Sequence, residues 1–446
     1  MTAPAAEVAP TGASSAGAEV SAALVQRAFT VFGGLAACGV LLAEPFIWAG
    51  LAGLFVTLLV AWRSGRGGGE RLPLRSVLRA CGVLFAFVAW GLFTAALGDA
   101  RLGGAVLARH LDWLWVPVVA LAWTLGGQSA RRGIAVAAAG VFLLSCLVAA
   151  LQYFGVWPPL ETFASLAWTK LPFHRMYEAI PGAEGRFMGG GLLMHRLKFS
   201  HTGALVVLGA MAVALHAKGA GRAAAIAVAL VGFGSIVVFP HARAVVGAVA
   251  GAGFILLVTS RLGWKSIAAL ALGGILLLFS VVALHDSFRE RLLSSLTAAG
   301  SGDRGSILQS GLRAAAEHPL VGTGLGRFRV GEWAAPEATA HVREHPGKAH
   351  NIFLSAAAEL GVPGALLLGA VIVSLAFVFR RASPGPVRSL AVAGLAFYAL
   401  LGMTHDPLFH TEVSLAFMLV FGAGVGAALT VSDPPRPEVD GPPARE

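Results

Sequence analysis

Long apolar runs separated by short polar segments dominate the chain. Each run approaches the roughly 20 helical residues that cross the hydrocarbon core of a bilayer. Twelve runs are found: 28–44, 46–62, 78–97, 106–125, 133–154, 202–217, 223–240, 243–260, 265–284, 351–379, 388–404 and 411–430. The pattern predicts an all-α polytopic membrane protein with about twelve transmembrane helices.

Basic residues are unevenly distributed among the connections between these runs. If the N-terminus is cytoplasmic, the connections after even-numbered runs hold fourteen Lys and Arg residues against one acid, Glu70. They are Arg63, Arg66, Arg71, Arg75, Arg79, Arg131, Arg132, Lys218, Arg222, Arg261, Lys265, Arg380, Arg381 and Arg388. Since cytoplasmic loops carry the excess of positive charge, we expect both termini in the cytoplasm.

Composition agrees with a membrane protein. Hydrophobic residues make up 57% of the chain and charged residues 13%, whereas soluble domains carry about 25% charge. This excludes a soluble enzyme, a disordered protein and a nucleic-acid-binding module, and the net charge of +10 is largely the orientation signal. Cys38, Cys81 and Cys146 lie inside apolar runs, so we expect small core residues rather than disulfides or metal ligands.

We expect three parts along the chain. Residues 1–27 and 432–446 read as disordered cytoplasmic tails, and residues 28–431 as a single transmembrane catalytic domain. Two external loops, 155–201 and 285–350, are long, and long loops in compact proteins usually carry function. The sequence of the loop 285–350 predicts a helix near 303–317, which Asp303 would cap and which would end before Pro319.

Histidines concentrate on the predicted external side. Twelve of the thirteen lie there, and only His216 lies near the cytoplasmic face. This distribution indicates polar chemistry at the outer membrane boundary, although longer external loops alone would also hold more residues of every kind.

Arg243 opens the apolar run 243–260 from the outside. A charge at this depth needs a partner or a wet cavity. Because a guanidinium group holds phosphate oxygens in a bidentate fork, Arg243 is a candidate phosphate-binding residue. The alternative is an arginine that snorkels to the interface.

The segment 185–201 places Arg186, Arg196 and Lys198 just outside the next apolar run, beside a run of three glycines. Glycine lets a backbone approach a ligand closely. Cations that converge at a membrane surface suit a lipid-linked phosphate or pyrophosphate. The alternative is attraction to anionic lipid headgroups.

The segment 348–364 contains His350, Asn351 and Glu359, followed by Gly-Val-Pro-Gly. An imidazole can accept a proton near neutral pH, although an isolated histidine is more often a structural hydrogen-bonding group. We expect Glu359 to bond a loop or a helix end, and the glycines and proline to kink the helix.

Motifs for metal or nucleotide chemistry are missing from the sequence. It has no His-Glu-x-x-His, Walker loop, Gly-x-Ser-x-Gly or Asp-x-Asp motif. His341 and His345 have helical spacing, which is weak evidence for a metal site. The glycines in 321–327 lack the strand and helix of a dinucleotide fold. We therefore expect a mechanism without cofactor or metal.

Several motifs together resemble the O-antigen ligase and O-antigen polymerase superfamily. They are Arg304, the His-Pro-x-x-Gly-x-Gly sequence at 318–324, His350-Asn351 and the Glu-x-Gly-x-x-Gly sequence at 359–364. Ala242-Arg243 also fits, although many members have Ser before that arginine. Within the superfamily, the closest resemblance is to the lipopolysaccharide O-antigen ligases.

The resemblance implies an integral-membrane glycosyltransferase with a GT-C-like fold, acting at the periplasmic face of a bacterial inner membrane. Its donor would be a glycan on undecaprenyl pyrophosphate, and its acceptor a sugar hydroxyl of lipid A core. The implied partners are these two lipids and the phospholipid membrane, and no nucleic acid is implied. Ligases of this family work without metal or ATP.

The roles implied by the resemblance fit the chemistry of the side chains. Guanidinium groups would stabilise the charge that grows on the leaving pyrophosphate. We assign this role to Arg243 first, then to Arg186 and Arg196, with Arg304 and Lys198 in support. His350 would be the general base for the acceptor hydroxyl, and direct displacement would invert the anomeric carbon.

Three alternatives stay open. An O-antigen polymerase shares the donor chemistry, and a protein O-oligosaccharyltransferase is a further relative. A secondary transporter also has about twelve spans, but transporters place polar residues near the middle of the bilayer, whereas this chain places them in external loops.

Overall fold

The computed structural model describes residues 13–63, 73–97, 104–156, 179–180, 183–260, 298–344 and 347–430, with scattered residues between 262 and 289. The regular structure of these residues is helical, apart from one isolated β-bridge between Ala179 and Phe187. Within these described residues, eight helices are long and apolar enough to span a membrane, or nine if one bent pair is a single span. The protein is thus an all-α polytopic membrane protein, as predicted.

The chain order gives the following helices. They are α1 (Ala13–Leu42), α2 (Glu44–Arg63), α3 (Leu74–Ala80), α4 (Gly82–Leu97), α5 (Gly104–Leu111), η1 (Asp112–Leu114), α6 (Trp115–Leu125), α7 (Gln128–Tyr153), η2 (Gly191–Leu193), α10 (Arg196–His216), α11 (Gly219–Val238), α12 (Arg243–Val258), α15 (Ala298–Glu317), η3 (Val330–Trp333), α16 (Ala340–Arg343), α17 (Ile352–Arg381), α18 (Pro386–Gly402), η4 (Pro407–Phe409) and α19 (Thr411–Leu429).

The count of twelve spans stays a prediction. α12 and α18 are apolar but shorter than the eight spanning helices. The expected run 265–284 lies largely outside the described residues, as do most of loop 155–201 and the tail 432–446. α1 begins at Ala13, inside the segment expected as a tail. Cys81 and Cys146 are buried, Cys38 is partly buried, and all three are free thiols.

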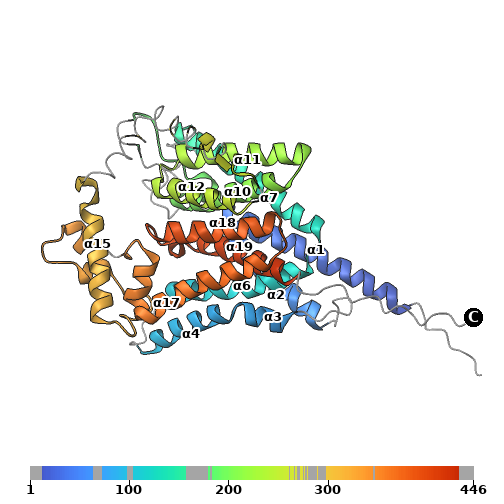
Figure 1. Cartoon of the computed structure of the whole chain (residues 1–446), viewed down its shortest axis with the longest axis horizontal. Helices are drawn as coiled ribbons and strands as arrows, with labels where there is room; N and C mark the ends of the chain where they lie inside the picture. Colours follow the sequence, from blue (N-terminus) through green and yellow to red (C-terminus); the bar gives the residue numbers. More distant parts are fainter. Residues whose placement is uncertain are drawn as a thin grey trace, which may run out of the picture.

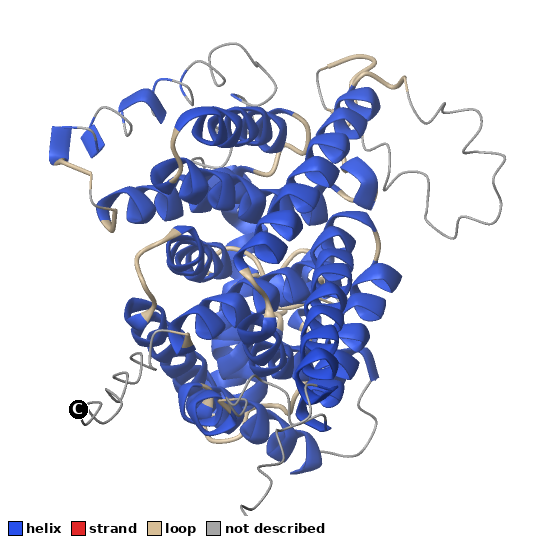
Figure 2. Cartoon of the chain, turned by 90° about the vertical axis from the view of Figure 1, so that its right-hand side faces the viewer, coloured by secondary structure: helices blue, strands red, loops and turns tan. Residues whose placement is uncertain are grey.

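The spanning helices run side by side, and α15 lies across one end of the bundle (Figure 1). We call this end the loop end; α10, α12, α17 and α19 all begin there. In the view turned by 90°, many of the helices are seen nearly end-on, and the described residues form no sheet (Figure 2). The layer of α10, α11 and α12 covers one side of α18 and α19, and α3 and α4 lie on the other side (Figure 1).

α19 is the central helix of the bundle. Its apolar window is 72% buried, the largest share among the eight spanning helices, and it packs against α6, α17 and α18. Gly422, Gly424 and Gly426 make these contacts possible, because a Cβ at any of them would lie within 3 Å of a neighbouring helix. Small residues let helix backbones approach closely in membranes, where dispersion contacts drive association.

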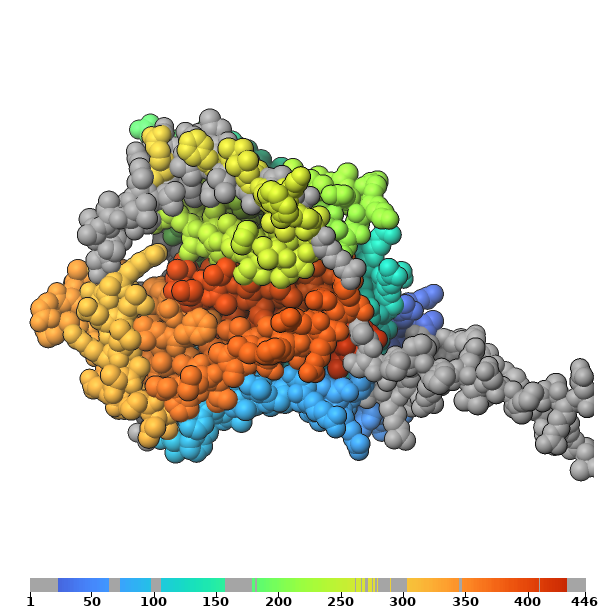
Figure 3. All heavy atoms as spheres, viewed as in Figure 1, coloured from blue at the N-terminus to red at the C-terminus, as the bar shows by residue number. Residues whose placement is uncertain are grey.

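The loop before α17 folds into a cap with a hydrophobic core of its own. Its buried members are Ile307, Ala314, Phe328, Val330, Ala338, Val342, Ala349 and Ala358. Through this core α15 packs against the start of α17, and the cap covers the loop end in the space-filling view (Figure 3). The described part of this loop is therefore an ordered structure at the loop end.

The predicted helix in this loop exists but begins earlier than expected. α15 starts at Ala298, so Asp303 lies inside the helix and the predicted capping role is wrong. Its carboxylate instead accepts a hydrogen bond from the Thr339 hydroxyl at 2.8 Å, which joins α15 to the start of α16. The predicted end is correct, because α15 stops at Glu317, immediately before His318-Pro319.

α17 is broken at Gly361, as the Gly-Val-Pro-Gly sequence predicts. Gly361 has φ 71° and ψ 178°, and Pro363 lacks an N–H, so the carbonyls before the break lose their helical donors. The neighbouring loop replaces them: Thr323 N–H donates to Ala358 O at 2.8 Å and Gly324 N–H to Glu359 O at 3.0 Å. The Trp90 indole N–H donates to Leu360 O at 2.8 Å.

We expect Gly322→Ala to destabilise the protein by about 2 kcal/mol or more. Gly322 has a left-handed φ of 67°, and an added Cβ would lie 2.3 Å from the carbonyl carbon of Glu359. The melting temperature of the purified protein in detergent measures the effect. Gly369→Ala is the matched control, since Gly369 lies inside α17 with open space around it; equal losses for both variants would contradict this account of the break.

Candidate functional site

The His350-Asn351 pair is fixed between the start of α17 and the end of α18. Asn351 caps α17, because its Oδ1 accepts hydrogen bonds from the N–H groups of Phe353 and Leu354 at 3.0 Å each. Its Nδ2 donates to the Met403 carbonyl at 3.3 Å. His350 precedes the cap with a left-handed φ of 53°, a conformation uncommon for non-glycine residues and often retained where it serves function.

Five histidines gather at the loop end, and His350 is one of them. The ring of His350 lies 6.4 Å from that of His405, and His405 lies 5.7 Å from His201 (centroid distances). A second contact joins His195 to His410 at 4.7 Å. These residues come from the starts of α10, α17 and α19 and from the segment that follows α18. We call His195, His201, His350, His405 and His410 the histidine group.

Two of the predicted arginines act on this group. Burial, together with the charges of His350, Arg304 and Arg196, lowers the pKa of His405 to about 4. Electrostatic influence of this kind requires proximity, so the structure brings three predicted site residues, Arg196, Arg304 and His350, into one neighbourhood around His405.

Lys198 has a more structural position than expected. Its Nζ bonds Glu412 Oε1 at 2.5 Å, and the Glu412 side chain is only 7% exposed. This ion pair joins the first turn of α10 to that of α19. Lys198 is also one of the charges that, after burial and His195, lower the pKa of His410 to about 3. Lys198 therefore borders the histidine group while its ammonium group is largely neutralised by Glu412.

Arg186 and Arg243 have different surroundings. The Arg186 guanidinium lies over the rings of Phe154 and Tyr153 at the end of α7, 4.6 and 5.7 Å from their centroids. Arg243 is partly buried and begins α12, which packs against α10 and α18. The Arg186 guanidinium thus contacts the end of α7. Arg243 lies on α12, which packs against α10, the helix of Arg196, and against α18, which His405 follows.

Lys348 and Glu359 form a buried ion pair on the other side of His350. Lys348 lies in the loop before α17, and Glu359 lies in the last turn before the break. This pairing confirms the expectation that Glu359 bonds a loop. Lys348 precedes His350 by two positions and Glu359 follows it in α17. The ion pair therefore fixes the backbone on both sides of His350.

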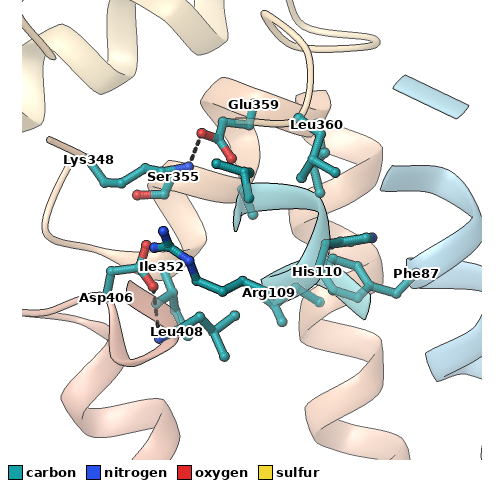
Figure 4. A pocket seen from close by; sticks show the side chains of 14 residues that line it. Phe87, Arg109, His110, Lys348, Ile352, Ser355, Glu359, Leu360, Asp406 and Leu408 are labelled. Carbon is teal, nitrogen blue, oxygen red and sulfur yellow. Dashed lines mark hydrogen bonds and ion pairs between the residues drawn. The ribbon is translucent and has the colours of Figure 1, made fainter. Parts of the chain in front are cut away.

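A small cavity of about 90 Å³ lies beside this ion pair and is shown in Figure 4. The Arg109 guanidinium reaches toward Asp406, whereas the Lys348 ammonium group points toward Glu359 (Figure 4). Asp406 caps η4 by accepting a hydrogen bond from Leu408 N–H at 3.1 Å. Burial raises the pKa of Asp406, and the charges of Lys348 and Arg109 oppose that rise.

Sequence reasoning did not assign a role to Arg109, Lys348, His405 or Asp406. The available signal was their place at the ends of apolar runs: Arg109 and Asp112 interrupt the start of one run, and His405-Asp406 lies between two others. Charged residues at such places mark either interfaces or sites. A site residue is distinguished from an interface residue by its proximity to His350, and this proximity is known only from the fold.

Residues 203–369 match the family model described as O-antigen ligase. This part of the chain is therefore similar to the O-antigen ligase superfamily. The O-antigen ligase match includes Arg243, Arg304, His350 and Glu359 and ends before α18. It supports glycan transfer of the ligase or polymerase type from a lipid-linked substrate in a membrane.

Two other comparisons add little to the O-antigen ligase assignment. No curated protein matches the chain. A chain from a structural study entitled "Structural coordination of polymerization and crosslinking by a peptidoglycan synthase complex" is similar over 78% of this chain and 96% of its own, with 17% identity and a TM-score of 0.43.

Breaking the Lys348–Glu359 pair should destabilise the protein. We expect Lys348→Met and Glu359→Gln to cost about 3 kcal/mol each, because the remaining partner stays buried. The double variant should recover part of the loss. Melting temperatures in detergent test this, with Glu332→Gln as control, since the Arg329–Glu332 pair is exposed and contributes little. A double variant whose loss equals the sum of the single losses would refute the coupling.

Acid should destabilise the histidine group. The folded pKa of His405, about 4, lies below the unfolded value of about 6.5, so its stabilising contribution is present above pH 6.5 and is lost as the pH falls toward 4. The loss at pH 4 is at most about 3 kcal/mol. We expect His405→Asn to flatten the decline of melting temperature between pH 7 and pH 4. His341→Asn, in the exposed loop, should leave the decline unchanged.

Proposed function

We propose that the protein transfers an O-antigen glycan from undecaprenyl pyrophosphate to a sugar hydroxyl of lipid A core, at the periplasmic face of the inner membrane. The observation that carries this proposal is the gathering of Arg196, Arg304 and His350 around His405 at one end of a membrane-embedded bundle. The similarity to the family supplies the reaction class.

The arginines would stabilise the leaving group. As the bond between the anomeric carbon and the pyrophosphate oxygen breaks, both of its electrons go to that oxygen and negative charge grows there. Guanidinium groups fixed in a partly dehydrated site stabilise such charge strongly. Arg304 and Arg196 are favoured by their place beside His405, and Arg243 by its position at the start of α12. Arg186 would contact the lipid-linked donor from the end of α7.

Lys198 would support this site indirectly. Because Glu412 neutralises its ammonium group, Lys198 adds less attraction for a diphosphate than an arginine of the histidine group does. Its contribution is to hold α10 against α19, which fixes the position of Arg196, two residues earlier in the chain.

His350 would act as the general base. Its imidazole removes the proton of the acceptor hydroxyl as the hydroxyl oxygen forms a bond to the anomeric carbon. The undecaprenyl pyrophosphate leaves from the opposite face, so the configuration at that carbon inverts. The glycan is already activated by its pyrophosphate, and the reaction as written therefore needs no nucleotide or metal ion.

The test is transfer by purified protein in detergent or vesicles. The mixture contains lipid-linked glycan, lipid A core and a chelator, without nucleotide, and the product is followed by its mobility on gels. We expect His350→Ala and Arg304→Ala to reduce the rate by about 100-fold or more. His341→Ala and Arg343→Ala, in the exposed part of the same loop, are matched controls and should keep the wild-type rate.

The acceptor distinguishes ligase from polymerase. Growth of the lipid-linked glycan when lipid A core is omitted would assign polymerase activity, and product that forms only with lipid A core would support the ligase. If His350→Ala and Arg304→Ala retain full transfer at equal protein level, the proposed mechanism is wrong. Melting temperatures of both variants separate a catalytic defect from misfolding.

A further inference from the structure

A second cavity, of about 230 Å³, lies at the loop end beside the histidine group. Its walls come from the first turns of α2, α10 and α19 and from the junction of α5 and η1. Its side chains include three carboxylates, two cations and one indole. They are Glu44, Asp112, Glu412, Arg109, Lys198 and Trp48. We call this space the Asp112 cavity.

One acceptor in this cavity lacks a hydrogen bond. Asp112 is 1% exposed, and its Oδ2 has no hydrogen bond of normal geometry among the described residues. The buried Ser414 hydroxyl, which also lacks such a bond, lies near enough to interact with the Asp112 carboxylate. The neighbouring carboxylates differ: Glu412 is bonded to Lys198, and Glu44 accepts the Trp48 indole N–H at 3.0 Å. A buried carboxylate oxygen without a donor is costly. Because Asp112 lines the cavity, a ligand hydroxyl there would supply a second donor to the carboxylate besides Ser414.

The chemistry of the walls selects a neutral, hydroxyl-bearing ligand. The carboxylates of Glu44, Asp112 and Glu412 oppose an anion, and the charges of Arg109 and Lys198 oppose a simple cation. Carboxylates accept hydrogen bonds from hydroxyl groups, whereas guanidinium and ammonium groups donate to them. The Trp48 ring offers an apolar face. A sugar ring has both features, hydroxyl groups at its rim and C–H groups on its faces.

The Asp112 cavity adjoins the proposed reaction centre. His410 lines it and is in ring contact with His195. Arg109 also lines the smaller cavity, where it points toward Asp406 (Figure 4). A sugar held in the Asp112 cavity would thus lie beside the group that contains the proposed base. Cavities of this polarity and size hold more than a single water.

We propose that the Asp112 cavity is a saccharide-binding subsite, in which Asp112 accepts a hydrogen bond from a sugar hydroxyl and Trp48 packs against the sugar ring. This inference rests on the proposed function, because it assigns the subsite to a sugar of the donor glycan or of the acceptor. Both sources present the same chemistry, and the experiment separates them.

The experiment measures binding before catalysis. Purified full-length protein is titrated with two probes, the free O-antigen oligosaccharide and the free core oligosaccharide, neither carrying lipid or pyrophosphate. Saturation-transfer NMR reports the bound sugar. We expect one probe to bind, and Asp112→Asn and Trp48→Leu each to weaken it by about tenfold or more. The probe that binds identifies the source.

A matched control and a kinetic readout complete the test. The control is Trp62→Leu. Trp62 lies on α2, like Trp48, but at the opposite end of the helix, where it is 70% exposed. This variant should bind the oligosaccharide as the wild-type protein does. In the transfer assay, Asp112→Asn should raise KM for the substrate that carries the bound sugar and change kcat less than threefold. Melting temperatures show whether each variant is folded.

The outcomes separate this inference from the proposed function. Asp112-dependent saccharide binding without any transfer by the wild-type protein would support the subsite and refute the proposed reaction. Transfer that depends on His350, with saccharide binding unchanged in folded Asp112→Asn and Trp48→Leu variants, would overturn the subsite and leave the reaction intact. Failure of both oligosaccharides to bind wild-type protein would also overturn it.

Discussion

The break in α17 is the constraint on which the loop end depends. In a low-dielectric environment every backbone carbonyl needs a donor, and Gly361 removes the helical donors of the turn before it. The loop that follows α15 supplies Thr323 and Gly324 N–H groups in their place. The glycine-containing motifs at 318–324 and 359–364 therefore form one structure. The first supplies the N–H donors that the carbonyls beside the second lack.

A shared backbone conformation starts three helices at this end. Met194, His241 and His350 are the described non-glycine residues with left-handed φ values, 51°, 52° and 53°. Each lies two residues before the first residue of α10, α12 or α17. The bend aims the next residues of each chain segment into the loop end, where Arg196, Arg243 and Asn351 are found. A left-handed histidine is tolerated better than a β-branched residue would be, which favours histidine at two of the three turns.

Sequence alone predicted what depends on local pattern. Apolar runs predicted the spans, Gly-Val-Pro-Gly predicted the break in α17, and His318-Pro319 predicted the end of α15. Asp303 was misread as a cap because a capping residue and a helical aspartate look alike when the preceding residues are small and polar. The partner of Lys198 could not be predicted, since Glu412 lies 214 residues from Lys198. His405 and Asp112 could be recognised as candidate site residues only from the neighbours that the fold places beside them.

Lysines and arginines at the loop end differ in what they bind, and the difference follows from their chemistry. Lys198 and Lys348 are each held by a buried glutamate, where a compact ammonium group satisfies one carboxylate. Arg196 and Arg304 instead act on His405, whose low pKa keeps its ring neutral at pH 7. A neutral ring beside two guanidinium groups does not neutralise them. In the proposed reaction, Arg196 and Arg304 would stabilise the charge of a departing diphosphate, while the lysine pairs stabilise the surrounding helices.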